Sequence, residues 1–130
     1  MAHYESDFAS VEYDRESGAV VGQLREFTEG EPFREYMEAI IEALDTEGSD
    51  RVLADTSQFD AALTQDDQVW SVKDWSPRAE EAGLEHMALV MPESVVAEMS
   101  VDSIVDMADD TINRGLFDDM DEAKAWLAEQ

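Results

Sequence analysis

The clearest pattern in the chain is an apolar stripe between positions 33 and 44. Its residues recur every three or four positions while glutamates fill the opposite face, and they are Phe33, Tyr36, Met37, Ile40, Ile41 and Leu44. This period predicts an amphipathic helix packed on a core. Pro32 suits its first turn, and Thr28 or Glu31 can cap it. Gly48 stands where the chain must leave the helix.

Shorter apolar runs predict the strands. Residues 4–13 alternate in polarity and residues 19–24 follow a turn, which predicts a β-hairpin. Residues 51–54 and 86–91 are nearly continuous apolar runs, as expected of strands covered on both faces. Residues 114–117 are predicted to form an edge strand.

Three more helices are expected after the run at 51–54. Thr64 begins a sequence that resembles a capping box, which opens a helix through Lys73, and Pro77 then caps or kinks it. Residues 93–110 have a weaker helical period that fits one long helix or two short ones. Asp119 is the predicted cap of a last helix that ends near Leu127.

The predicted order of elements is therefore ββαβαβαβα, within a single domain that spans residues 1–130. Strands that alternate with helices indicate right-handed parallel crossovers. The expected fold is α/β, with an N-terminal hairpin and a five-stranded, largely parallel sheet. No linker, internal repeat or low-complexity tract interrupts it.

Charge changes the picture of the surface. The chain has a formal net charge of −25, from 33 acidic and eight basic residues. The acids are spread along the whole sequence, which is typical of extreme halophiles, because molar salt screens the repulsion between them. An acidic mimic of nucleic acid would instead gather them on one face. Binding to DNA or RNA is excluded, since phosphates would be repelled.

The sequence also restricts the compartment and the available chemistry. Cysteine is absent, so disulfides and thiolate metal sites are excluded. We find neither a signal peptide nor an apolar run long enough for stable membrane insertion, which predicts a cytoplasmic protein. No nucleophile elbow, phosphate-binding glycine loop or metal motif is present, so we expect no catalytic residues, no metal and no cofactor.

Several of these segments resemble the SpoIIAA-like family, whose STAS-type domains are related to anti-sigma factor antagonists and to the CRAL-TRIO lipid-transfer fold. The similar segments extend over about residues 7–128, and they are residues 51–55, residues 70–78 with Trp70 and Trp75, residues 87–92, and residues 117–127. The resemblance implies a STAS-like fold, a regulatory role through protein contacts, and a possible homodimer.

The resemblance also implies a phosphorylation switch at the helix after the third strand. Asp55 and Ser57 match the start of the family's motif, but its serine-glycine pair is missing. Ser57 and Thr64 are the remaining candidates for phosphorylation. A helix start would favour a phosphate at Thr64, whereas Asp66 and Asp67 would repel it.

Two groups of residues are candidate binding sites. Asp55, Thr56 and Ser57 follow the strand at 51–54 and lie at the predicted rim of the sheet, where ligands and partners bind in open α/β folds. They could equally satisfy turn amides.

Trp70, Trp75 and Arg78 could instead form an aromatic pocket with a guanidinium for an anionic head group. The alternative is that both tryptophans are core or dimer contacts. We therefore expect a non-catalytic interaction or regulatory domain that binds an unknown protein or a small apolar or anionic ligand at the rim. The alternative function is a small-molecule or lipid-like carrier with a Trp-lined pocket.

Overall fold

The fold is an α/β sandwich built on one mixed sheet. The computed structural model describes residues 2–6, 9–24, 31–58, 65–93, 95–107 and 112–130. Its six strands lie in chain order, and they are β1 (Ala2–Glu5), β2 (Ala9–Asp14), β3 (Ala19–Leu24), β4 (Arg51–Asp55), β5 (His86–Val90) and β6 (Asn113–Phe117). Strands β1 to β3 are antiparallel, and β3 to β6 are parallel. The α/β class is confirmed.

The predicted count of five strands is wrong, because the first expected strand is two strands. β1 pairs antiparallel with β2, and Ser6 lies at the end of β1. The Ser6 amide donates to the Ala9 carbonyl at 2.8 Å, and the Ala9 amide donates to the Ser6 hydroxyl at 3.2 Å. A serine that bonds to the nearby backbone in this way competes with an extended strand. The alternation is in fact interrupted by three polar residues in a row, Glu5, Ser6 and Asp7, and the prediction of a single strand overlooked this signal.

The helices also differ in detail from the predicted order ββαβαβαβα. They are α1 (Glu31–Glu47), α2 (Gln65–Trp70), the π-helix η1 (Ser71–Trp75), α3 (Ser76–Glu81), α4 (Val95–Met107) and α5 (Met120–Ala128). Gly48 follows α1 with a φ of 65°, as predicted for the residue at which the chain leaves the helix. The region expected to hold one or two helices forms one, α4. Thr28 and Thr64 lie outside the described residues.

Pro77 neither ends nor breaks its helix. The segment continues from α2 into α3 through the π turn η1, where the Ser76 amide donates to the Ser71 carbonyl. In a regular helix a proline lacks one N–H donor and clashes with the carbonyl four residues earlier. The wider π turn directly before Pro77 relieves that conflict.

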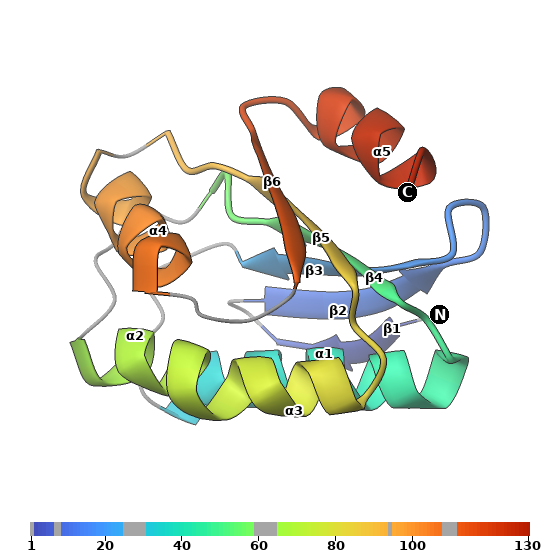
Figure 1. Ribbon diagram of the computed structural model, residues 1–130, viewed down its shortest axis with the longest axis horizontal. Helices are drawn as coiled ribbons and strands as arrows, with labels where there is room; N and C mark the ends of the chain where they lie inside the picture. The colour runs from blue at the N-terminus through green and yellow to red at the C-terminus, as the bar shows by residue number, and fades with distance from the viewer. Residues whose placement is uncertain (1, 7–8, 25–30, 59–64, 94, 108–111) are drawn as a thin grey trace.

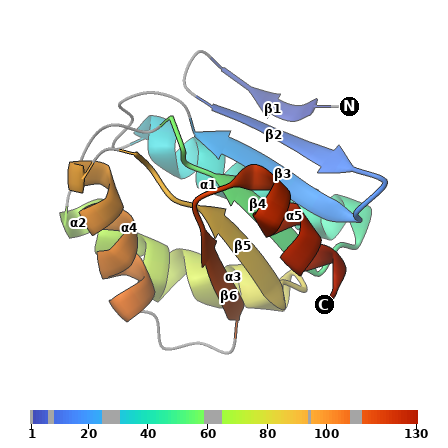
Figure 2. The ribbon, with the colours of Figure 1, turned by 90° about the horizontal axis from the view of Figure 1, so that it is seen from above.

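The helices cover the two faces of the sheet unequally. Helices α1, α2, α3 and α4 lie on one side, and α5 lies on the other (Figures 1 and 2). This follows from the strand order, because right-handed crossovers between successive neighbouring strands place every connecting helix on the same face. No described pair of strands reverses that order, so the sheet lacks the crevice that a topological switch point opens.

Strand β4 is the central element, as the sequence predicts. It pairs in parallel with both β3 and β5. Val52 and Ala54 belong to the large core beneath the helices, and Leu53 belongs to the smaller core beneath α5. Both faces of the strand are therefore buried, which explains its continuous apolar sequence. Across the described residues, no helix combines the length and the apolar character that membrane crossing requires.

Candidate functional site

The carboxyl end of β4 holds the residues that were predicted to line the rim. Asp55 is 5% exposed, and one of its oxygens accepts hydrogen bonds from the Ser57 amide at 3.0 Å and the Ser57 hydroxyl at 2.6 Å. Its other oxygen accepts a bond from Gln23 Nε2 at 3.2 Å. The amide and hydroxyl of Thr56 both donate to the Val90 carbonyl, at 3.1 and 2.6 Å. These bonds fix the side chains of Asp55 and Thr56 at the carboxyl end of β4.

Asp55 and Thr56 line hollows on opposite faces of the sheet, as successive strand residues do. Thr56 lines a partly open apolar pocket on the helix side, the interior cavity, and Asp55 lines a similarly open hollow on the side of α5. The sequence therefore located a point between two concave surfaces, although it did not indicate either of them.

The interior cavity has a volume of about 70 Å³. It lies between the sheet and helices α1, η1 and α4, and its wall is mostly apolar. The lining residues include Leu24, Phe33, Tyr36, Met37, Ile40, Ala54, Met87, Leu89, Ile104 and Val105, together with Thr56, Ser71, Trp75, Ser76 and Arg114. A concave apolar surface with a few polar groups is the usual form of a small-molecule site.

The π turn supplies one side of this wall. Ser71, Trp75 and Ser76 line the cavity, and all three are at most 2% exposed. Trp75 is fixed by a 2.7 Å hydrogen bond from its indole nitrogen to the Met37 carbonyl on α1. π turns inside helices occur frequently at functional sites.

Most of the polar groups in the wall are already engaged. Besides Thr56, the Ser71 hydroxyl donates to the Asp67 carbonyl and the Ser76 hydroxyl donates to the Ser71 carbonyl, both at 2.9 Å. The Arg114 guanidinium donates to the Ser76 hydroxyl at 3.3 Å. These bonds lock the hydroxyl hydrogens onto neighbouring oxygens.

Tyr36 is the exception in this wall. It is 2% exposed, and its hydroxyl has no hydrogen-bond partner in the part of the chain that the structure describes. Burial raises the pKa of the Tyr36 hydroxyl, and the negative charge of Asp55 raises it further. Tyr36 therefore stays a neutral phenol that can donate a hydrogen bond. Gly22 makes room for it, since a β-carbon at Gly22 would lie 2.6 Å from the hydroxyl oxygen.

The structure separates the three residues expected to form an aromatic pocket. Only Trp75 lines the cavity. Trp70 packs edge-on against Phe33 with ring centroids 6.3 Å apart, and the guanidiniums of Arg34 and Arg78 lie 5.1 and 5.9 Å from its ring centroid. Trp70 is therefore partly buried, in contact with the core on one side and with two guanidiniums on the other.

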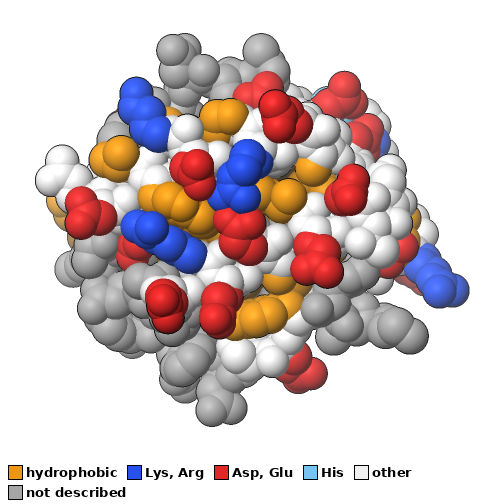
Figure 3. All heavy atoms as spheres, turned by 90° about the horizontal axis from the view of Figure 1, so that it is seen from below, with side chains coloured by type: hydrophobic (Ala, Val, Ile, Leu, Met, Phe, Trp, Pro, Cys, Tyr) orange, Lys and Arg blue, Asp and Glu red, His pale blue; other side chains and the backbone are white. Residues whose placement is uncertain are grey.

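Arg78 is held by carboxylates on the surface. Its guanidinium bonds to both oxygens of Glu38 and to one of Asp74, and these bonds raise its pKa. Figure 3 shows this helical face, where acidic side chains are scattered among basic and apolar ones and do not form one patch. Arg78 therefore does not contribute to the cavity.

A second hollow lies on the open face of the sheet, with a volume of about 450 Å³. Strands β2, β3 and β4 form its floor, and α5 contributes Met120 and Lys124. Several carboxylates line it beside Arg15, so the hollow is polar. Asp55 belongs to it but is already bonded to Gln23 and Ser57.

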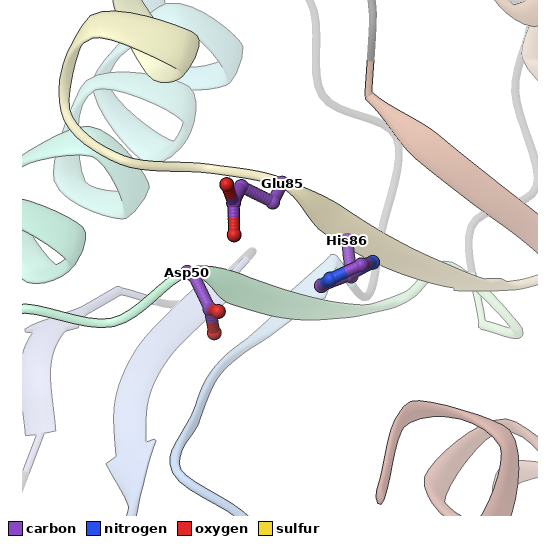
Figure 4. Close-up of side chains that lie close together, drawn as sticks. All are labelled: Asp50, Glu85 and His86. Atoms are coloured by element: carbon purple, nitrogen blue, oxygen red, sulfur yellow. The ribbon is translucent and has the colours of Figure 1, made fainter. Parts of the chain in front are cut away.

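A third feature lies at the opposite, amino-terminal edge of the sheet. Asp50, Glu85 and His86 gather there, with ligand atoms within 4.8 Å of one another (Figure 4). Asp50 accepts a 3.0 Å bond from Arg51, and although burial opposes its ionisation, this bond and the Arg51 charge lower its pKa. A metal ion would have to compete with this guanidinium for the Asp50 carboxylate. We therefore describe these three residues as a polar cluster at the amino-terminal ends of β4 and β5.

The two candidate phosphorylation sites remain predictions. The Ser57 hydroxyl is half-buried and donates to Asp55, so a kinase would have to break that bond. A phosphate there would also stand beside the Asp55 carboxylate, which would repel it. Thr64 lies outside the described residues.

Comparison of the chain with protein-family models found no match, and comparison with curated proteins found no significant match. The fold thus defines the class of this protein as a small α/β domain with one mixed sheet and a mostly apolar pocket between the sheet and its helices.

Tyr36 is the functional candidate that the sequence did not reveal. In the pattern it is one more apolar residue of the helical stripe. Gly22 offered the available signal, because a lone glycine within a strand often marks a close approach of another group. Only the three-dimensional structure shows that the group close to Gly22 is the Tyr36 side chain.

Proposed function

We propose that the protein is a non-catalytic, STAS-like domain that binds a small, mainly apolar molecule in the interior cavity. The observation that carries the proposal is the cavity wall itself. It combines about 70 Å³ of space with a mostly apolar lining and a few polar groups. Concave surfaces of this kind are the usual form of small-molecule sites.

A regulatory role fits the position of the cavity. Helix α4 contributes Ile104 and Val105 to its wall, while its residues Val95 and Met99 face the solvent. A molecule bound beneath α4 would therefore act on a helix that is also part of the surface. This is how we connect ligand binding with the regulatory function that the family resemblance implies.

Native mass spectrometry of protein purified from its own organism tests the proposal. In molar ammonium acetate we expect a bound small mass that is lost on mild activation. Ala54→Val is the matched control, because Ala54 lines the cavity and a larger side chain fills it. The same mass on both proteins would place the ligand elsewhere, and its absence from both would contradict the proposal.

A second candidate function is docking of a protein partner on α4. Val95 is 69% exposed and Met99 is 64% exposed, and α4 packs beside α2, where Val69 is 38% exposed. Given the charge of the chain, the partner would be a protein with an apolar patch bordered by basic residues. A Met99→Glu variant that keeps the full affinity for a captured partner would refute this candidate.

We further propose that the protein works in the cytoplasm of an organism adapted to high salt. The spread of carboxylates over the surface supports this environment. A homodimer is part of the same proposal, because screening by molar salt permits two such acidic chains to associate. Sedimentation in dilute and molar KCl measures this directly, and a monomer under both conditions would contradict the dimer.

A further inference from the structure

Strand β6 forms one edge of the described sheet. It is the last strand in the order, at the edge opposite β1 (Figure 2), and among the described elements it packs mainly against β5 and α5. Leu116 on this strand is 44% exposed. A strand edge is a template for pairing with another strand unless charges, proline or a bulge protect it. β6 contains no proline, and its one charged residue is Arg114.

The backbone of β6 bonds to its inner neighbour through alternate residues. The Asn113 amide donates to the Glu85 carbonyl at 2.9 Å. The Met91 amide donates to the Phe117 carbonyl at 2.7 Å, so Asn113 and Phe117 both bond on the side of β5. Successive residues of a strand direct their N–H and C=O groups to opposite sides. Those of Leu116 therefore point away from β5, next to a side chain that is also exposed.

The charge distribution favours a second copy of the chain as the partner of this edge. Of the 130 residues 33 are acidic, so two copies repel each other over most of their surfaces. No acidic residue occurs between positions 111 and 117. Two copies can therefore approach along β6 without placing carboxylates of the strand against each other. Asp118, which is exposed, follows directly after the strand.

Side-chain chemistry selects one antiparallel register. Among the registers that pair the outward backbone groups about a two-fold axis, Leu116 can oppose Arg114, Leu116 or Asp118 of the second copy. Only the register that opposes Leu116 to itself forms an apolar pair, and it also places Arg114 opposite Asp118 on both sides of the axis. The Arg114 guanidinium bonds to the Ser76 hydroxyl, and its several N–H donors allow it to hold a carboxylate as well.

We propose that two copies of the chain pair antiparallel through β6, with Leu116 at the two-fold axis, and so join their six-stranded sheets into one. This inference rests on the proposed homodimer, since it names the interface. Leu116 supplies main-chain hydrogen bonds and an apolar contact, while the two pairs of Arg114 with Asp118 define the register. Molar salt is required, because it screens the repulsion between the remaining acidic surfaces.

Single cysteines test the contact directly, because the chain has none of its own. In the proposed register the two Cα atoms of residue 116 lie about 5.5 Å apart, within the disulfide range of about 4.4–6.8 Å. Leu116→Cys should therefore form a covalent dimer in a glutathione redox buffer with molar KCl. Met99→Cys is the matched control, since Met99 is 64% exposed but lies on α4, and this variant should stay uncrosslinked.

Sedimentation equilibrium of Asp118→Arg in molar KCl tests the register. The new arginine would oppose Arg114 of the second copy, so the dissociation constant of the dimer should rise about tenfold as two cross-strand pairs are lost. Asp45→Arg is the control, because it changes the net charge equally at an exposed position of α1, which packs against β1, β2 and β3. It should dimerise at least as well as the wild type.

The possible failures are distinguishable. A wild type that stays monomeric at every concentration in molar KCl refutes the inference together with the proposed homodimer, and leaves the edge to a strand of another protein. A dimer whose Leu116→Cys variant fails to crosslink, or crosslinks no better than Met99→Cys, uses another surface, and the inference alone fails. If Leu116→Cys crosslinks but Asp118→Arg dimerises as well as Asp45→Arg, the register is refuted.

Discussion

The contact between Gly22 and Tyr36 predicts a strong coupling between a strand and a helix. In Gly22→Ala the new β-carbon would lie 2.6 Å from the Tyr36 hydroxyl and 3.1 Å from the Ile40 δ-methyl. Both neighbours are at most 2% exposed, so neither can turn into solvent. Overpacking of this kind costs about 1–3 kcal/mol. Because alanine is preferred to glycine in a strand by about 0.5–1 kcal/mol, the net loss should be about 1–2 kcal/mol.

Tyr36→Phe removes the atom at the centre of that clash. On its own it should stabilise the protein by about 1 kcal/mol, because it deletes a buried hydroxyl that has no partner among the residues that the structure describes. In the Tyr36→Phe background, Gly22→Ala should cost less free energy of unfolding, since the 2.6 Å contact is gone while those of 3.1 Å to Ile40 and 3.2 Å to the aromatic ring remain. The coupling energy of the pair should therefore be about 1 kcal/mol.

Urea unfolding of the four proteins in molar KCl measures this cycle. Tyr13→Phe is the control for loss of a tyrosine hydroxyl, and it should not alter the effect of Gly22→Ala. If Gly22→Ala destabilises the wild type and Tyr36→Phe by equal amounts, the close approach of Gly22 to the hydroxyl is refuted. If Tyr36→Phe lowers stability, the hydroxyl has a partner.

Three further predictions concern pH, salt and packing. The pKa of Tyr36 is raised in the folded state, so its contribution to stability is complete below the unfolded value of about 10 and is lost as the pH rises above it, by up to about 1.4 kcal/mol per pH unit. Tyr36→Phe should flatten this alkaline slope in unfolding measurements, and an unchanged slope would contradict the burial of the phenol. The urea midpoint of the wild type should rise steeply from dilute to molar KCl, because salt screens the net charge of −25, and a flat response would refute adaptation to salt. Ala54→Val should raise the free energy of unfolding by about 0.5–1 kcal/mol by filling the cavity, and a loss of stability would indicate that this space is not available.

Elements that carry their own periodicity were predictable from the sequence. The stripe between Phe33 and Leu44 gave α1, and the run from Arg51 gave β4 as an interior strand. Asp119 was identified as the cap of α5, and its side chain accepts a bond from the Glu122 amide. In each case a local pattern of burial or hydrogen bonding is sufficient to define the element.

Features that depend on contacts distant in sequence were not predictable. The π turn at Ser71 reconciles Pro77 with a continuous helix, and no periodicity signals it. Gly22 needs to lack a side chain only because Tyr36 of α1, which is distant in sequence, packs against it. The cavity likewise arises from the spacing of α1, η1 and α4 above the sheet, so residue types alone could not locate it.

The position of the cavity follows from the topology. Successive parallel strands that remain neighbours put all connecting helices on one face, and without a reversal of strand order the sheet edge offers no crevice. The proposed binding site lies instead within the helical layer, where the irregular helix η1 is part of its wall. The π turn η1 contributes Ser71 and Trp75 to this wall, and α1 contributes Tyr36. Converting η1 to a regular helix by deleting one residue within it should therefore close the cavity and abolish ligand binding, even where the fold survives.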